Sequence, residues 1–232
     1  QKLARNEATR VNPIVKGVIT KDQRDALLDW MTSIRELFRY SYQSLALAVY
    51  LFDLSLSLRS IATQESKKII IAGAALLIGA NFYDVNLPNP QDILTRIGGT
   101  SMNELKEVID DILVQTSFDL SPATTYLFLS RHLLSISQPK TVQRAKQIWL
   151  ASLKTNSYFD VSPSQLVQDI IILSESNQET TLSAKRLSEE ISNQETIPLS
   201  AKRLSEEVVS RNLQLEQNSS VKSSSFPRFF PS

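Results

Sequence analysis

The chain lacks cysteine and has only 5 glycines and 1 histidine among its 232 residues. Without cysteine it can form neither a disulfide framework nor a thiolate metal site, and we expect an intracellular protein. Scarce glycine and almost no strand-like alternation argue against a β-rich fold. The sequence also has no P-loop and no dinucleotide-binding glycine pattern, so no cofactor and no metal are expected.

Neither sign of charge dominates the chain. Lys and Arg number 25 against 24 Asp and Glu, for a net charge of +1. Because nucleic-acid binding proteins usually carry a basic face, no nucleic-acid partner is expected. The apolar run 69–80 has twelve residues, whereas a helix that crosses a bilayer needs about 20. We therefore expect no membrane span.

What the sequence does contain is helical periodicity. Apolar residues recur every three or four positions, which predicts an all-α fold. Thr20 with Gln23 and Ser101 with Glu104 are capping-box pairs, and Asn89 before a proline is a further helix start. The predicted helices cover residues 20–40, 42–59, 66–82, 90–97, 102–115, 121–136, 141–153 and 162–174.

The third predicted helix contains the apolar run 69–80 and is apolar on every side, which is typical of a buried central helix. Its alanines and glycines would let neighbouring helices approach closely. For the first two helices, the spacing predicts inward faces made of Ala26, Leu27, Trp30, Ile34 and Phe38, and of Leu45, Ala48, Val49, Phe52 and Leu56.

Both ends of the chain differ from its middle. Residues 1–19 form an irregular N-terminal extension, interrupted by a proline. Residues 176–191 and 192–208 are near-copies, a tandem duplication of a polar, helix-capable unit within the segment 176–216. Residues 217–232 are rich in serine and are predicted to be disordered.

Four sequence patches, in order, carry a resemblance to a known family. Residues 24–30 follow an R-x-x-L-x-D-W pattern, and residues 47–56 follow LA-x-x-x-x-D-x-x-L. AALLIGANFYD (74–84) and SFDLSPAT (117–124) are similar to the third helix and to the segment that leaves the fifth. Over about residues 20–130 the chain therefore resembles the cyclin box.

The resemblance implies a cyclin fold. Residues 20–120 would form the first cyclin-box repeat, a five-helix bundle around a central buried helix, and residues 121–175 a truncated second repeat. It also supplies a partner for Arg24. Asp29 lies five residues away, where a helix places side chains poorly for pairing. By resemblance, Arg24 forms a structural salt bridge with Asp53 of the second helix.

Function follows from the same resemblance. Cyclins are regulatory proteins and not enzymes, and they bind and allosterically activate a cyclin-dependent protein kinase in cell-cycle or transcription control. Kinase substrates are a further candidate partner, and the expected location is the nucleus, the cytoplasm or both. The residues that match the kinase-binding positions are Ile78, Asn81, Phe82, Asp110, Leu113, Phe118 and Leu120.

Some positions depart from the family pattern. A lysine usual in the third helix is replaced by Asn81, and the glutamate that pairs with it is replaced by Ile109, with Asp110 adjacent. A substrate-docking groove on the first helix would comprise Gln23, Ala26, Leu27 and Trp30. Half of its apolar area is lost, so weak recruitment of substrate peptides is expected. The alternative function is a cyclin-fold interaction module or scaffold that binds no kinase.

No pattern indicates a catalytic site. His132 has no nucleophile at a fixed spacing. Asp110 and Asp111 are adjacent, so on a helix their carboxylates diverge. Ser-Pro steps at residues 121 and 162 match the substrate preference of proline-directed kinases, but helix capping explains both steps more simply.

Overall fold

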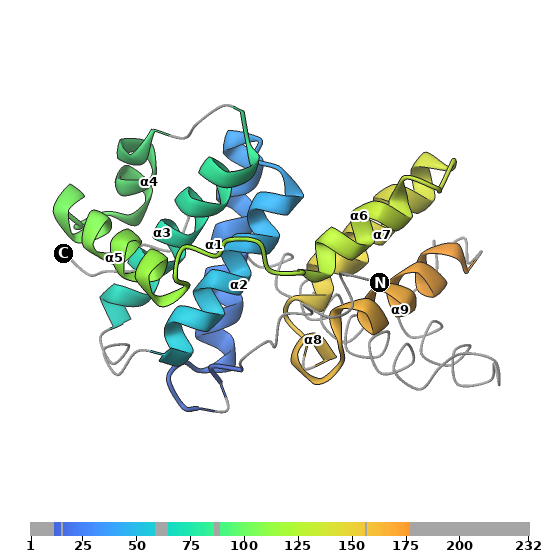
Figure 1. Ribbon diagram of the computed structural model, residues 1–232, viewed down its shortest axis with the longest axis horizontal. Coiled ribbons are helices and arrows are strands. Elements are labelled where there is room, and N and C mark those ends of the chain that lie inside the picture. Colours follow the sequence, from blue (N-terminus) through green and yellow to red (C-terminus); the bar gives the residue numbers. More distant parts are fainter. Residues whose placement is uncertain (1–11, 15, 59–64, 86–88, 156, 177–232) are drawn as a thin grey trace, which may run out of the picture. The chain divides into compact units, whose positions relative to one another are not determined.

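A computed structural model describes residues 12–14, 16–58, 65–85, 89–155 and 157–176 (Figure 1). Within these ranges the chain is helical and contains no β-strand, which confirms the all-α prediction. The helices are α1 (Lys21–Phe38), α2 (Tyr42–Leu58), α3 (Glu65–Tyr83), α4 (Pro90–Ile97), α5 (Met102–Gln115), α6 (Thr125–Leu133), α7 (Pro139–Ser152), α8 (Ser157–Asp160) and α9 (Pro163–Glu175).

The predicted helix starts of α1, α4 and α5 are confirmed. Thr20 and Gln23 form a capping box. Gln23 N donates to Thr20 Oγ1 at 3.2 Å, and Thr20 N donates to Gln23 Oε1, also at 3.2 Å. Ser101 and Glu104 form a second capping box before α5. The Asn89 side chain caps α4. These starts depend only on residues within four positions, so the sequence specifies them directly.

The start of α6 was predicted wrongly. The helix begins at Thr125 and not at the Ser-Pro step, because the Thr124 hydroxyl is the side chain that caps it, accepting from Leu127 N. It also ends three residues earlier than predicted. There the backbone N and the hydroxyl of Ser135 both donate to the carbonyl of His132 and form a turn.

Helix α3 lies at the centre of the first five helices. Every residue from 69 to 80 is buried, and α3 contacts α1, α2, α4 and α5. Figure 1 shows α3 between α2 and α5. The prediction of a buried central helix is therefore confirmed. Helix α2 is also buried on nearly every side, with only Tyr50 and Leu54 partly exposed between residues 44 and 56.

The two central helices approach closely at a glycine. A Cβ atom on Gly79 would collide with the backbone carbonyl oxygen of Ser44 at the start of α2. Gly73, six residues earlier, faces instead the side chains of Ile97 and Ile93 on α4. Glycine at position 79 thus sets the α2–α3 distance, as the small-residue pattern predicts.

The inward face of α1 differs from the predicted stripe. Its buried residues are Arg24, Leu27, Leu28, Met31 and Ile34. Ala26 is exposed, and Trp30 and Phe38 are only half-buried. The helix is rotated because an arginine, rather than an apolar side chain, occupies the first inward position. Hydrophobic periodicity assigns no inward position to a charged residue, so it predicted a face shifted toward Ala26 and Trp30.

The described residues divide into two compact units. One combines the chain up to Ser137 with Tyr158–Val167, and the other combines Gln138–Ser157 with the chain from Gln168 onward. The duplicated segment 176–216, apart from Ser176, the serine-rich segment 217–232 and most of residues 1–19 lie outside the described residues. None of the described helices is long and apolar enough to span a lipid bilayer.

Candidate partner-binding surface

Arg24 and Asp53 join α1 to α2 inside the first unit. Arg24 Nε donates to Asp53 Oδ1 and Arg24 Nη2 donates to Asp53 Oδ2, both at 2.8 Å. The residues are only 1% and 4% exposed. Burial alone would lower the pKa of the guanidinium, but the charge and hydrogen bonds of Asp53 outweigh it, and the pKa of Arg24 is raised. This two-point contact fixes the register of α1 on α2.

Two aromatic rings from a distant part of the sequence cover the same guanidinium. Arg24 Cζ lies 4.7 Å from the ring centroid of Phe159 and 5.6 Å from that of Tyr158. Both rings belong to α8, which the sequence did not predict, and the segment 158–167 belongs to the same compact unit as α1. Sequence reasoning missed this contact because no periodic pattern links residues 134 and 135 positions apart.

The end of α3 is held against the start of α2. The Asp84 carboxylate accepts hydrogen bonds from Ser41 N at 3.1 Å and from Ser44 Oγ at 2.7 Å. A carboxylate at a helix N-terminus also interacts favourably with the helix dipole. Asp84 is therefore a positioning residue for Phe82, two residues before it. The family-like patch AALLIGANFYD (74–84) contains a signal for it, because Asp84 is the last residue of that patch.

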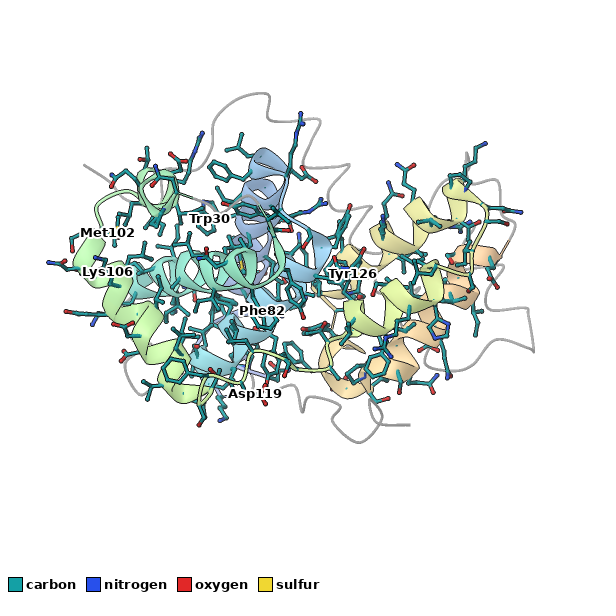
Figure 2. All side chains as sticks on the ribbon, turned by 45° about the horizontal axis from the view of Figure 1, so that its top comes forward. Trp30, Phe82, Met102, Lys106, Asp119 and Tyr126 are labelled. Carbon is teal, nitrogen blue, oxygen red and sulfur yellow. The ribbon has the colours of Figure 1, made fainter. Side chains whose placement is uncertain are left out.

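Three candidate kinase-contact residues lie near that end of α3. Phe82, which is labelled in Figure 2, is 47% exposed, and Asn81 is also exposed. The Phe82 ring meets the Tyr83 ring edge to face, with centroids 4.9 Å apart. Ile78 is only 5% exposed and belongs to the core. The surface candidates on α3 are therefore Asn81 and Phe82.

The remaining candidates lie on α5 and on the segment after it. Asp110 is exposed, Leu113 and Leu120 are half-buried, and Phe118 is 69% exposed. Sequence reasoning missed Val114, which is 66% exposed on α5. An apolar residue that falls outside the inward spacing of a helix is the signal that could have identified it.

Phe118 has an unusual backbone conformation. Ser117 and Phe118 have φ angles of 51° and 60°, the left-handed region that bulky side chains rarely adopt. Phe118 N donates to the Leu113 carbonyl at 2.8 Å, which closes the end of α5. The strained turn and the exposed ring occur at the same residue, and such strain is concentrated at functional positions.

The residues of the expected substrate-docking groove present little apolar surface. Leu27 is buried in the core and Ala26 is exposed, while Trp30 is half-buried. The Gln23 side chain already accepts hydrogen bonds from Thr20 N and, at 3.2 Å, from Lys68 Nζ. The face therefore offers one partly exposed indole and a polar cluster in place of a continuous apolar groove.

The described residues contain no group of three His, Cys, Asp or Glu side chains that could hold a metal ion. His132, the only histidine of the chain, is exposed near the end of α6. Asp110 and Asp111 are exposed at adjacent positions of α5.

Comparisons with known proteins identify the fold. The family model for the N-terminal domain of cyclins matches residues 3–121. G2/mitotic-specific cyclin-B3 of Mus musculus is 26% identical over 159 residues, which cover 67% of this chain and 11% of that protein. The first three curated relatives are matched over 11%, 32% and 38% of their lengths, so the chain spans well under two thirds of each.

Two solved structures share the fold. A viral cyclin from herpesvirus saimiri superposes with a TM-score of 0.65 at 21% identity, covering 85% of this chain and 89% of the viral chain. A chain of the yeast RNA polymerase II CTD kinase complex CTDK-1 superposes with a TM-score of 0.59 at 15% identity, covering 90% of this chain and 79% of the yeast chain.

Proposed function

Because the chain belongs to the cyclin family, we propose that it is a regulatory subunit that binds a cyclin-dependent protein kinase and activates it allosterically. The observation that carries this proposal is the exposure of Phe82 and Phe118, at 47% and 69%, where α3 ends and after α5. The proposed docking surface consists of Asn81, Phe82, Asp110, Leu113, Val114, Phe118 and Leu120.

Exposed aromatic rings on a rigid helical frame are suited to protein binding. Phenylalanine side chains bury a large apolar area when a partner covers them, and aromatic anchors dominate many interfaces. Phe82 lies two residues before Asp84, which is hydrogen-bonded to the start of α2. The end of α3 that carries Phe82 is therefore fixed before binding. Preorganisation of this kind reduces the entropy that association would otherwise cost.

The proposed action is a change in the shape of the kinase. The docked surface would press on the regulatory helix of the kinase and complete the Lys–Glu ion pair that phosphoryl transfer requires. In this mechanism the chain contributes no catalytic group of its own. A kinase partner places the protein in the nucleus, the cytoplasm or both, and substrates of the kinase become secondary partners.

The polar part of the surface supports a second candidate function. Asn81 replaces a lysine, and Ile109, half-buried on α5, replaces the glutamate that would pair with it. Asp110 is exposed but lies about 100° further around the helix. A surface without the ion pair fits a cyclin-fold interaction module that uses the same aromatic anchors for a partner other than a kinase.

A binding experiment with purified catalytic subunits of cyclin-dependent kinases tests the proposal. The immobilised full chain is compared with Phe82→Asp, Phe118→Asp and the control Leu134→Asp, whose side chain is 88% exposed beyond the end of α6. We expect the wild type and Leu134→Asp to retain a kinase subunit and to raise its phosphoryl-transfer rate. Each phenylalanine variant should retain at least about tenfold less, as loss of an anchor residue costs 2 kcal/mol or more.

Failure of the wild type to retain any subunit of the panel would reject the kinase proposal in favour of the interaction module. Equal retention by all four proteins would place the docking surface elsewhere. Circular dichroism of each variant checks that the helical bundle is intact.

A further inference from the structure

The sequence contains two serines that precede proline, Ser121 and Ser162, and no threonine that precedes proline. Proline-directed protein kinases modify such serines when the hydroxyl and the proline ring are accessible outside a helix. In the sequence alone the two steps are equivalent, because either serine can cap a following helix. The structure distinguishes them.

Ser162 is a helix cap. Its Oγ lies 3.2 Å from Gln165 N, directly before α9, and the following Pro163 is buried. Modification of this serine would break the cap, and the proline ring is not available to a kinase. This step is therefore fully explained by the fold.

Ser121 does not cap a helix. Helix α6 begins four residues later, and its cap is Thr124. Ser121 is exposed and Pro122 is partly exposed, in the non-helical segment between α5 and α6. The Ser121 hydroxyl donates to Asp119 Oδ1 at 2.7 Å, and its backbone N donates to the same oxygen at 3.1 Å. These two bonds also lower the pKa of the Asp119 carboxyl. Figure 2 shows Asp119 on this segment.

We infer that Ser121 is a phosphorylation site for a proline-directed kinase and that its phosphorylation weakens partner binding at the proposed docking surface. In the reaction, Ser121 Oγ attacks the γ-phosphorus of ATP. The bond from this phosphorus to the oxygen that leaves with ADP breaks, and the hydroxyl proton passes to a base of the modifying kinase. The hydrogen bond to Asp119 is released in the same step.

The consequence follows from charge, and this part of the inference rests on the proposed function. A phosphate carries about −1.5 to −2 charges at pH 7. On Ser121 it would lie beside the Asp119 carboxylate and next in sequence to Leu120, three residues from the exposed ring of Phe118. A partner that covers the apolar surface would have to desolvate this charge, which opposes binding. A bound partner would in turn shield Ser121, so the free chain is the substrate.

The test uses the full chain, Mg-ATP and a purified, constitutively active mitogen-activated protein kinase as the proline-directed enzyme. Wild type is compared with Ser121→Ala and with the matched control Ser162→Ala. Intact mass and peptide mapping report the modified residue. We expect a phosphate on Ser121 in wild type and in Ser162→Ala, and none at that position in Ser121→Ala. Absence of phosphate on Ser121, or phosphate on Ser162 in its place, overturns the assignment.

The second arm measures retention of the cyclin-dependent kinase subunit before and after treatment. Retention should fall at least about tenfold for wild type, recover after phosphatase treatment, and remain unchanged for treated Ser121→Ala. Phosphate on Ser121 with unchanged retention would overturn the regulatory consequence. If untreated wild type retains no subunit, the proposed function fails, while the mass measurement still decides whether Ser121 is a modification site.

Discussion

Arg24 and Asp53 form a two-point salt bridge between α1 and α2, 2.8 Å at each contact. A buried charge without a partner is costly, so this pair requires one arrangement of α1 on α2. The arrangement determines which side of α1 faces the core. It thereby leaves Ala26 exposed, Trp30 half-buried and Leu27 in the core.

A double-mutant cycle on this bridge should show strong coupling. Arg24→Ala and Asp53→Ala should each lower the free energy of unfolding by about 3–5 kcal/mol, because each leaves one buried charge unpaired. The double variant should cost much less than the sum of the two. Urea unfolding measures all four proteins, and strictly additive losses would show that the groups are not coupled.

The ring of Phe159 should stabilise the same guanidinium. Phe159→Leu keeps an apolar side chain but removes the π face 4.7 Å from Arg24 Cζ, so we expect a loss of about 1–2 kcal/mol in the free energy of unfolding. In an Arg24→Ala background the same substitution should have almost no effect. An equal loss in both backgrounds would mean that Phe159 acts only through packing.

Two glycines of α3 should respond differently to alanine. Gly79→Ala should destabilise the protein by about 1–3 kcal/mol, because its Cβ collides with the backbone carbonyl of Ser44, which cannot rotate away. In Gly73→Ala the added Cβ would lie 2.6 Å from Ile97 Cδ1, but the Ile97 side chain can move. The gain in helix propensity of about 1 kcal/mol should offset much of that cost. Thermal unfolding of both variants provides the comparison, and similar losses would contradict it.

Tyr40 should make the protein sensitive to alkali. Burial, followed by the charges of Asp84 and Asp92, raises the pKa of Tyr40 to about 12 from an ordinary value of 10.0. The unfolded chain therefore loses this proton at lower pH than the folded chain does. Stability is unaffected below pH 10 and falls by about 1.4 kcal/mol for each pH unit between 10 and 12.

Tyr40→Phe should weaken that dependence. Within the described residues the Tyr40 hydroxyl is buried without a hydrogen-bond partner, so its removal should be neutral or slightly stabilising at pH 7. Unfolding curves recorded at pH 7 and at pH 11 separate the two effects. A variant with the same alkaline loss as wild type would assign the loss to another group, such as Tyr126, whose pKa is also raised to about 12, chiefly by burial.

Restoring the family ion pair should strengthen kinase binding. Asn81→Lys combined with Ile109→Glu places opposite charges at two positions where the chain departs from the cyclin pattern. We expect the double variant to bind the kinase subunit several-fold more tightly than wild type, and each single change to give less than half of that gain in binding free energy. Titration calorimetry measures the four affinities. A double variant no tighter than wild type would show that the lost pair does not limit binding.

Several features of the fold could be read from the sequence because they depend on near neighbours. The capping boxes at Thr20 and Ser101 involve residues three positions apart, and the apolar run 69–80 can be satisfied only by burial. The candidate site was predicted in part. Phe82 and Phe118 were identified by their place in family-like motifs, and the structure leaves both rings exposed.

Other features depend on contacts between distant residues. The sequence alone could not separate Ser121 from Ser162, because the choice of cap for α6 depends on the fit of Thr124 to the helix start. It gave no signal for the rings of α8 over Arg24. By itself, the sequence determined which segments are helical and which helix must be buried, since both follow from local hydrogen bonding and hydrophobicity. Only the tertiary structure decided which face of α1 is exposed to solvent, because the buried pair of Arg24 and Asp53 sets the rotation of that helix. No local sequence pattern encodes the energy of that pairing.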